Sequence, residues 1–175
     1  MEMVTLPSEA AYWVVPSLLL AGEHPGLDRG YQAQLVITTL VRLGIIHFID
    51  LTEATEAREY NEVLQTLDAS TIYTTSLYHR LSITDRSIPS IERMQTILNT
   101  IDAAHQQRAG VYVHCHAGIG RTGTVIGCYL ARHGLSRNNR LRTITRLRRH
   151  TALNFMKAPE TEQQRQFVRD WPVGY

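Results

Sequence analysis

The alternation of apolar and polar stretches along the chain predicts an α/β fold. Runs of β-branched and aromatic residues are typical of buried strands, and such runs occur at 45–51, 71–75 and 111–114. Apolar residues recur with helical spacing in the intervening and following segments, which predicts helices at roughly 31–43, 55–67, 90–107, 121–133, 137–149 and 160–170. Strands that alternate with helices favour a central, mostly parallel sheet flanked by helices. No domain boundary is visible, so we expect a single domain over residues 1–175.

Composition narrows the class of protein. The chain has 175 residues, of which 43% are hydrophobic and 19% charged, as in globular proteins. The most apolar N-terminal run, residues 10–21, contains Pro16 and is too short to span a bilayer. Two cysteines, Cys115 and Cys128, do not make a disulfide framework. These features predict a cytoplasmic protein without a membrane span.

Charge is distributed unevenly along the chain. Residues 1–102 carry 13 acidic residues and 6 arginines, whereas residues 103–159 carry 9 arginines, Lys157 and no acidic residue. A positive field of this kind favours an anionic ligand. Seventeen of the 18 basic residues are arginine, which grips phosphate with two parallel hydrogen bonds. Biased base composition of the gene would also produce this excess of arginine.

The stretch VYVHCHAGIGRTG, residues 111–123, lies inside the positively charged half of the chain. A short apolar strand ends at Cys115, and glycines lead from it to Arg121 and a helix start. Successive N–H groups at a helix N-terminus cradle an anion, and Gly118 and Gly120 let the backbone curl inward. Because the arginine fork and these N–H groups stabilise negative charge, the thiolate of Cys115 is favoured and suits nucleophilic attack. The sequence therefore predicts a phosphate-binding loop with a cysteine nucleophile at its base.

Three other interpretations of this stretch remain to be weighed against the structure. Gly118, Gly120 and Gly123 match the dinucleotide fingerprint, although no acidic residue follows before Glu160. His114 and His116 flank the cysteine, but alternate strand residues face opposite sides, so we expect no metal site and no cofactor. A non-catalytic phosphate-binding module is the third interpretation.

The segment VHCHAGIGRTG resembles the signature loop of the cysteine-dependent protein tyrosine phosphatase superfamily, His-Cys-x5-Arg-Ser/Thr-Gly. Residues 83–89, ITDRSIP, resemble the general-acid loop of dual-specificity phosphatases, although TDRS is also typical of an ordinary polar turn. Residues 44–52 and 18–26 are similar to the early core strand and entry turn of that group. No Trp-Pro-Asp triplet precedes Asp85, which favours the dual-specificity or atypical members.

The resemblance implies a tyrosine-phosphatase-like fold and a role for each residue of the motif. Cys115 is the expected nucleophile, Arg121 the phosphate clamp and Asp85 the general acid, with His114 and Thr122 supporting the loop. The backbone expected to bind phosphate is that of His116, Ala117, Gly118, Ile119, Gly120 and Arg121. Gln163, Gln164 and Gln166 lie where related phosphatases sometimes keep a glutamine that orients water.

These roles predict hydrolysis of phosphotyrosine, phosphoserine or phosphothreonine in proteins through a cysteinyl-phosphate intermediate. Phosphoinositides, inositol phosphates and RNA 5′-phosphates suit the same chemistry. The helix predicted at 137–149 places Arg142, Arg146 and Arg149 on one face, opposite its apolar residues. That face is either solvated surface or a docking site for an acidic substrate. Aromatic residues do not interleave with its arginines, which argues against nucleic acid as a partner.

Overall fold

A computed structural model describes residues 6–26, 31–56, 60–70 and 76–175 of the chain. Its centre is a five-stranded sheet in the order β1-β2-β5-β3-β4. The strands are β1 (Tyr12–Val15), β2 (Leu19–Gly22), β3 (Ile45–Asp50), β4 (Leu77–Arg80) and β5 (Gly110–His114). Strand β1 is antiparallel to β2, while β2, β5, β3 and β4 run parallel to one another. The predicted α/β class with a mostly parallel sheet is confirmed.

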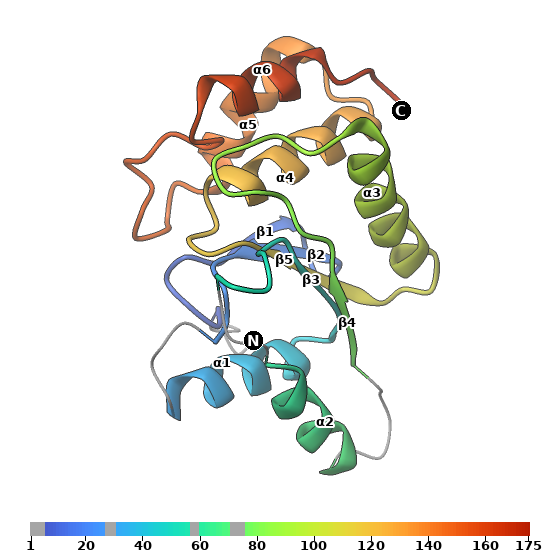
Figure 1. Ribbon diagram of the computed structural model, residues 1–175, viewed down its shortest axis with the longest axis vertical. Coiled ribbons are helices and arrows are strands. Elements are labelled where there is room, and N and C mark those ends of the chain that lie inside the picture. The colour runs from blue at the N-terminus through green and yellow to red at the C-terminus, as the bar shows by residue number, and fades with distance from the viewer. Residues whose placement is uncertain (1–5, 27–30, 57–59, 71–75) are drawn as a thin grey trace.

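Helices cover both faces of the sheet (Figure 1). Helices α1 (Tyr31–Arg42) and α2 (Asn61–Ser70) lie on one face. The other face carries α3 (Ile91–Gln106), α4 (Gly120–Arg132), α5 (Arg140–Leu147) and α6 (Glu162–Asp170), with a short 3₁₀ turn at Arg137–Asn139 before α5. Among the helices described, none combines the length and the apolar character needed to cross a membrane.

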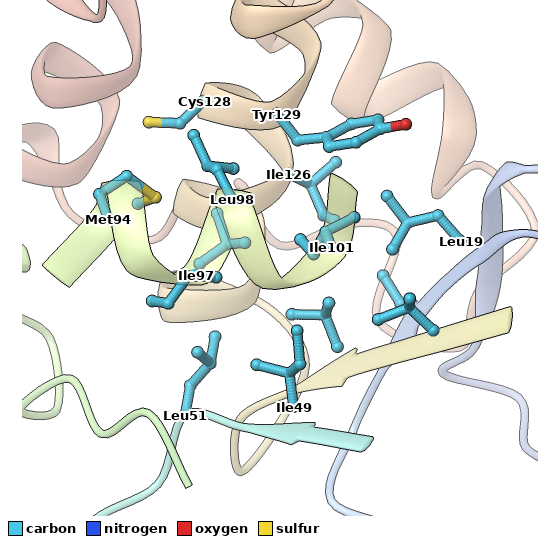
Figure 2. Packing of buried hydrophobic residues seen from close by; sticks show 14 of the residues in the cluster. Leu19, Ile49, Leu51, Met94, Ile97, Leu98, Ile101, Ile126, Cys128 and Tyr129 are labelled. Atoms are coloured by element: carbon cyan, nitrogen blue, oxygen red, sulfur yellow. The ribbon is translucent and has the colours of Figure 1, made fainter. Parts of the chain in front are cut away.

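Strands β1, β2, β3 and β5 divide their side chains between two hydrophobic cores. Val111 and Val113 of β5 join a cluster with residues of α3 and α4, whereas Tyr112 joins Phe48 in a second cluster beneath α1 and α2. Figure 2 shows the first cluster, in which Ile97 and Ile101 of α3 lie over the sheet. Burial of both faces requires strands that are nearly all apolar, which is the pattern the sequence shows. The sheet is therefore a rigid platform whose carboxyl ends position the loops described below.

Most of the predicted elements lie within one or two residues of those observed. Helix α3 follows Ser90 as expected, with the Ser90 hydroxyl accepting from the amide of Arg93 at 3.1 Å. The predicted strand 71–75 lies outside the described residues, and the fourth strand is found at Leu77–Arg80. The described part of α2 begins at Asn61 rather than near 55.

The N-terminal hairpin of β1 and β2 was not predicted as two strands. Residues 10–21 form one apolar run, and only a turn around Ser17, with a φ of 63°, divides it. At the other end of the chain, the predicted helix 137–149 is a 3₁₀ turn followed by the shorter α5. No strand follows α4 in the described residues 133–175, so the βαβ context that a dinucleotide site requires is missing and that interpretation is wrong.

Candidate active site

The segment that connects β5 to α4 forms a loop at the carboxyl end of the sheet, and we call this segment with the first two residues of α4, residues 115–121, the phosphate loop. Two backbone hydrogen bonds tie this end of β5 and the loop to their neighbours. The amide of Leu51 donates to the carbonyl of His114 at 2.9 Å, and the amide of His24 donates to the carbonyl of His116 at 3.0 Å. Since β2 and β3 flank β5 on both sides, the loop is fixed by the sheet itself.

Gly118 gives the phosphate loop its tight curve. Its φ is +71°, in the region that favours glycine. A Cβ atom at this position would lie 2.5 Å from both the carbonyl carbon and the oxygen of Gly22. Glycine is therefore required here for its backbone conformation and also because two backbone segments meet.

The phosphate loop encloses a pocket of about 340 Å³. Cys115 is 3% exposed, and Arg121 is 2% exposed at the start of α4. No side chain hydrogen-bonds to the N-terminal amides of α4 at its cap, Ile119, among the described residues. These amides and the helix dipole face the loop and suit an anion. The pocket is lined by Glu56, Asp85, Cys115, His116, Ala117, Ile119, Gly120, Arg121 and Glu160.

The structure brings the three predicted catalytic residues to this one pocket, although they come from different parts of the chain. Asp85 lines the pocket two residues after the buried Ile83, and we call residues 84–89 the acid loop. The Asp85 carboxylate lies 3.0 Å from Nη2 of Arg121, and its side chain is 60% exposed. This exposure leaves the carboxylate accessible to a substrate.

Glu56 lines the same pocket and was not predicted. Its two carboxylate oxygens accept hydrogen bonds from Nη1 and Nη2 of Arg121 at 2.6 and 2.8 Å. Burial alone would raise the pKa of Glu56, but the hydrogen bonds from Arg121 and from the amide of Glu53 lower it below its usual value. In the sequence, Glu56 belongs to the polar stretch TEATEAREY, where nothing distinguishes it from its acidic neighbours.

The fork of Arg121 is held by acceptors from two segments, around Glu56 and around Ile83–Asp85. Besides Glu56 and Asp85, the carbonyl oxygen of Ile83 accepts from Nη1 at 3.2 Å. Burial alone would lower the pKa of Arg121, but the bond to Glu56 and the nearby negative charges raise it. The guanidinium is therefore permanently charged and fixed in direction, as a phosphate clamp requires.

His114 lies in the interior directly before the phosphate loop. Its Nδ1 lies 3.4 Å from the carbonyl oxygen of Cys115, and its Nε2 lies 2.7 Å from the hydroxyl of Tyr60. Because a carbonyl only accepts, Nδ1 carries the hydrogen and Nε2 accepts from Tyr60. Burial lowers the pKa of His114 to about 3, so the ring is neutral at pH 7.

Thr122 carries a buried hydroxyl with no hydrogen-bond partner in the described part of the chain. A buried hydroxyl without a partner is costly in a folded protein. Thr122 follows Arg121 in the first turn of α4, immediately after the phosphate loop. The free hydroxyl is consistent with the supporting role toward the sulfur that the family resemblance implies.

A buried group behind the loop has the composition of a metal site. The ligand atoms of His24, Asp50 and His114 lie within 4.8 Å of one another. However, Nδ1 of His24 accepts from the amide of Gly26 at 3.0 Å, so the Nε2 that faces Asp50 carries a hydrogen. The Nδ1 of His114 that faces Asp50 also carries one. These two N–H groups lie 3.9 Å from the Asp50 oxygens, which is too far for a hydrogen bond, and neither nitrogen offers a lone pair to a metal.

The three glutamines near α6 have different surroundings. Gln163 and Gln166 are exposed, whereas Gln164 is fully buried. Both ends of the Gln164 amide are engaged, since Oε1 accepts from the amide of Thr161 at 3.1 Å and Nε2 donates to the carbonyl of Ser87 at 3.0 Å. The structure therefore separates these side chains, and of the three only Gln164 lies in the interior.

The arginines of residues 137–149 fall into an exposed group and a buried group. Arg142, Arg146 and Arg149 are exposed, and Ile144 is buried on the opposite face, as the periodicity predicted. Arg140 instead is buried and donates to carbonyls of Val168, Arg169 and Trp171 at the end of α6. Arg148 is buried as well and donates to the carbonyls of Leu153 and Met156. Part of the arginine excess thus stabilises the fold.

The chain is similar in sequence to known phosphatases. Residues 8–169 match the family described as "Swiss Army Knife protein, DSP-PTPase phosphatase domain". Mouse dual specificity protein phosphatase CDC14A is 29% identical over 136 residues, which are 69% of this chain and 19% of that protein. Phosphatidylglycerophosphate phosphatase PTPMT1 of Arabidopsis thaliana is 33% identical over 76 residues, which are 42% of this chain and 23% of that protein.

The fold is also found in solved structures. The crystal structure of Tk-PTP in the active form has a TM-score of 0.72 to this chain, with 21% identity, and the match covers 93% of this chain and 95% of that one. At this identity the match establishes the fold. The matched segments make up about a fifth of the length of the two curated relatives.

Proposed function

Because the chain belongs to the DSP-PTPase family of the cysteine-dependent protein tyrosine phosphatase superfamily, we propose that it hydrolyses phosphomonoesters through a covalent cysteinyl-phosphate intermediate. The proposed substrates are phosphotyrosine, phosphoserine or phosphothreonine residues of proteins. The observation that carries this proposal is the pocket shared by Cys115, Arg121 and Asp85.

In the first step, the thiolate of Cys115 attacks phosphorus from the base of the pocket. An S–P bond forms while the P–O bond to the leaving group breaks, and Asp85 donates its proton to the leaving oxygen. The loop amides from His116 to Arg121 and the Arg121 fork bind the equatorial oxygens. Glu56 keeps that fork oriented, since it accepts from both terminal nitrogens.

In the second step, water hydrolyses the thiophosphate. The carboxylate of Asp85, now ionised, takes a proton from water while the O–P bond forms and the S–P bond breaks. The departing thiolate accepts a hydrogen bond from the Thr122 hydroxyl, which has no other partner among the described residues. Phosphate then leaves and the enzyme returns to its starting state.

A phosphorylated lipid is the second candidate substrate. The similarity to a phosphatidylglycerophosphate phosphatase, at 33% identity over 76 residues, supports it. The chemistry at Cys115 is the same for both substrates, so the choice depends on the surface around the pocket. Rates with phosphopeptides, phosphatidylglycerophosphate in micelles and inositol phosphates, measured side by side, distinguish the two candidates.

The proposal is tested by hydrolysis of an aryl phosphate in the presence of a chelator. Wild-type protein is expected to turn over, and Cys115→Ser to lose turnover while still binding vanadate or phosphate. Cys128→Ser is the matched control, because Cys128 is the other free cysteine and is buried in α4 among apolar residues. Turnover that survives in Cys115→Ser would exclude Cys115 as the nucleophile.

A further inference from the structure

The acid loop has few local interactions of its own, and a segment distant in sequence holds it. Within the loop, the amide of Ser87 donates to the carbonyl of Thr84 at 3.1 Å. Arg86 has a φ of +58°, a conformation that is unfavourable for a residue with a side chain. Such a turn persists only when its surroundings stabilise it.

The stabilising contacts come from residues 160–164, which lead into α6. Nε2 of Gln164 donates to the carbonyl of Ser87 at 3.0 Å. Nη1 of Arg86 forms an ion pair with Oε1 of Glu160 at 2.8 Å. The hydroxyl of Thr161 also lies 3.5 Å from the carbonyl of Arg86. Two consecutive residues of the acid loop, beside Asp85, are thus held from the same side.

Gln164 contacts the phosphate loop as well. A Cβ atom at Gly120 would lie 3.1 Å from Oε1 and 3.2 Å from Nε2 of Gln164, so the amide packs directly on the start of α4. The side chain is completely buried, and its other polar atom accepts from the amide of Thr161. One rigid amide therefore spans the distance between the loop that carries the nucleophile and the loop that carries Asp85.

The contacts that Gln164 and Glu160 make with the acid loop differ in strength. The Arg86–Glu160 pair is solvent-accessible, with side chains 66% and 32% exposed, and exposed pairs contribute little. The Gln164 side chain is completely buried and its bond to Ser87 is partly buried, so its loss would leave the carbonyl of Ser87 without this donor. Beside the Asp85–Arg121 ion pair and the bond from Thr84 to Glu53, the Gln164 amide is accordingly the contact from the protein interior that holds the backbone of the acid loop.

We propose that Gln164 is a positioning residue for Asp85: by bridging Gly120 and Ser87, it holds the general acid over the phosphate bound at Cys115. The inference deepens the proposed function and rests on it, since it assumes that Asp85 donates the proton. It assigns Gln164 a role in orienting a protein loop instead of a water molecule.

The test compares two substrates and a double variant. Asp85→Asn removes the proton donor, so it slows an alkyl phosphate far more than an aryl phosphate with a good leaving group. Gln164→Ala is expected to show the same selectivity, with about tenfold loss on the alkyl phosphate and little on the aryl phosphate. In the Asp85→Asn background, Gln164→Ala should have no further effect, because the group it positions is absent. Gln163→Ala, an exposed neighbour, is the matched control.

A second variant separates this role from the stability of α6, in which Gln164 is part of a capping box with Thr161. Gln164→Glu keeps an oxygen for the Thr161 amide but, when ionised, cannot donate to Ser87. Its alkyl-phosphate activity should fall as in Gln164→Ala, although the oxygen that accepts from the Thr161 amide is kept.

Amide hydrogen exchange supplies a readout that does not depend on activity. Gln164→Ala should accelerate exchange within residues 84–89, and Gln163→Ala should not. Equal losses on both substrates, an additive effect in the double variant, or unchanged exchange would overturn the inference. If the wild type shows no turnover that depends on Cys115, the proposed function fails, and the exchange experiment still decides whether Gln164 holds the acid loop.

Discussion

The phosphate loop and the acid loop face the same pocket, but different interactions fix them. The phosphate loop connects a central strand to a buried helix, and backbone hydrogen bonds from both neighbouring segments hold it. The acid loop follows an edge strand and is held by side chains of residues 160–164, more than 70 residues away in sequence. Cys115 is therefore positioned by the fold itself, whereas the position of Asp85 depends on a few side-chain contacts.

Outside the catalytic side chains, the largest loss of kcat/KM is expected from a substitution that changes the backbone of the phosphate loop. Gly118→Ala should lower kcat/KM more than about 10²-fold, because the added methyl group meets the Gly22 backbone and displaces the loop by about 1 Å. Gly44→Ala is the matched control: its φ is +82°, yet no atom lies within 4 Å of the new Cβ. It should cost about 1–2 kcal/mol of stability and leave kcat/KM unchanged. Similar kinetics for the two variants would show that the close contact at Gly22 is unimportant.

A smaller loss of kcat/KM is expected from a substitution at Glu56, which contacts Arg121 between the two loops. Glu56→Gln removes the carboxylate that accepts from both terminal nitrogens of the guanidinium. Because charge-assisted pairs of this geometry are strong, kcat/KM should fall about tenfold with every phosphomonoester. Glu62→Gln, at an exposed acidic residue in the first turn of α2, should leave it unchanged. A loss confined to alkyl phosphates would instead show that Glu56 acts through Asp85.

Lowering the pH should reduce the free energy of unfolding through His114, which lies behind the phosphate loop. The folded-state pKa of His114 is lowered by burial to about 3, whereas the unfolded chain has the ordinary value of 6.5. The unfolded state therefore binds more protons below pH 6.5, and the free energy of unfolding should fall by up to about 1.4 kcal/mol per pH unit from this residue. Urea unfolding at pH 7, 6 and 5 measures the slope, and His114→Asn should make it shallower. An unchanged slope in that variant would contradict a buried, neutral His114.

The smallest effect is expected on the preference for acidic substrates, from substitutions of the exposed arginines far from both loops. Replacing Arg142, Arg146 and Arg149 with Gln should reduce the preference for acidic over neutral phosphopeptides by less than about threefold. The reduction should disappear at high salt, because exposed charges are screened within about 10 Å at ~0.1 M. Arg140→Gln is the contrasting variant, since Arg140 caps the carbonyls at the end of α6 and its loss should lower the melting temperature. An unchanged preference in the triple variant would remove the docking role and leave the proposed chemistry intact.

The α/β class, the helix start at Ser90 and the loop from Cys115 to Arg121 could be predicted from the amino-acid sequence. These features are local: strand composition, a capping residue and glycine spacing record the conformation in consecutive residues. The resemblance of residues 83–89 to an acid loop also located Asp85, and the structure places that residue 3.0 Å from Arg121. The catalytic roles of these residues stay predictions until the variants are measured.

The partners of these residues became visible only in the folded chain. Glu56 and Gln164 lie in polar stretches where neighbouring residues of the same type look identical, and their contacts with Arg121 and Ser87 join distant segments. Likewise, Arg140 and Arg142 are two residues apart, yet one is buried and the other exposed, because α6 packs against one side of α5. A contact between distant segments leaves no periodic signal in the chain, so the packing of the elements alone assigns such residues their roles.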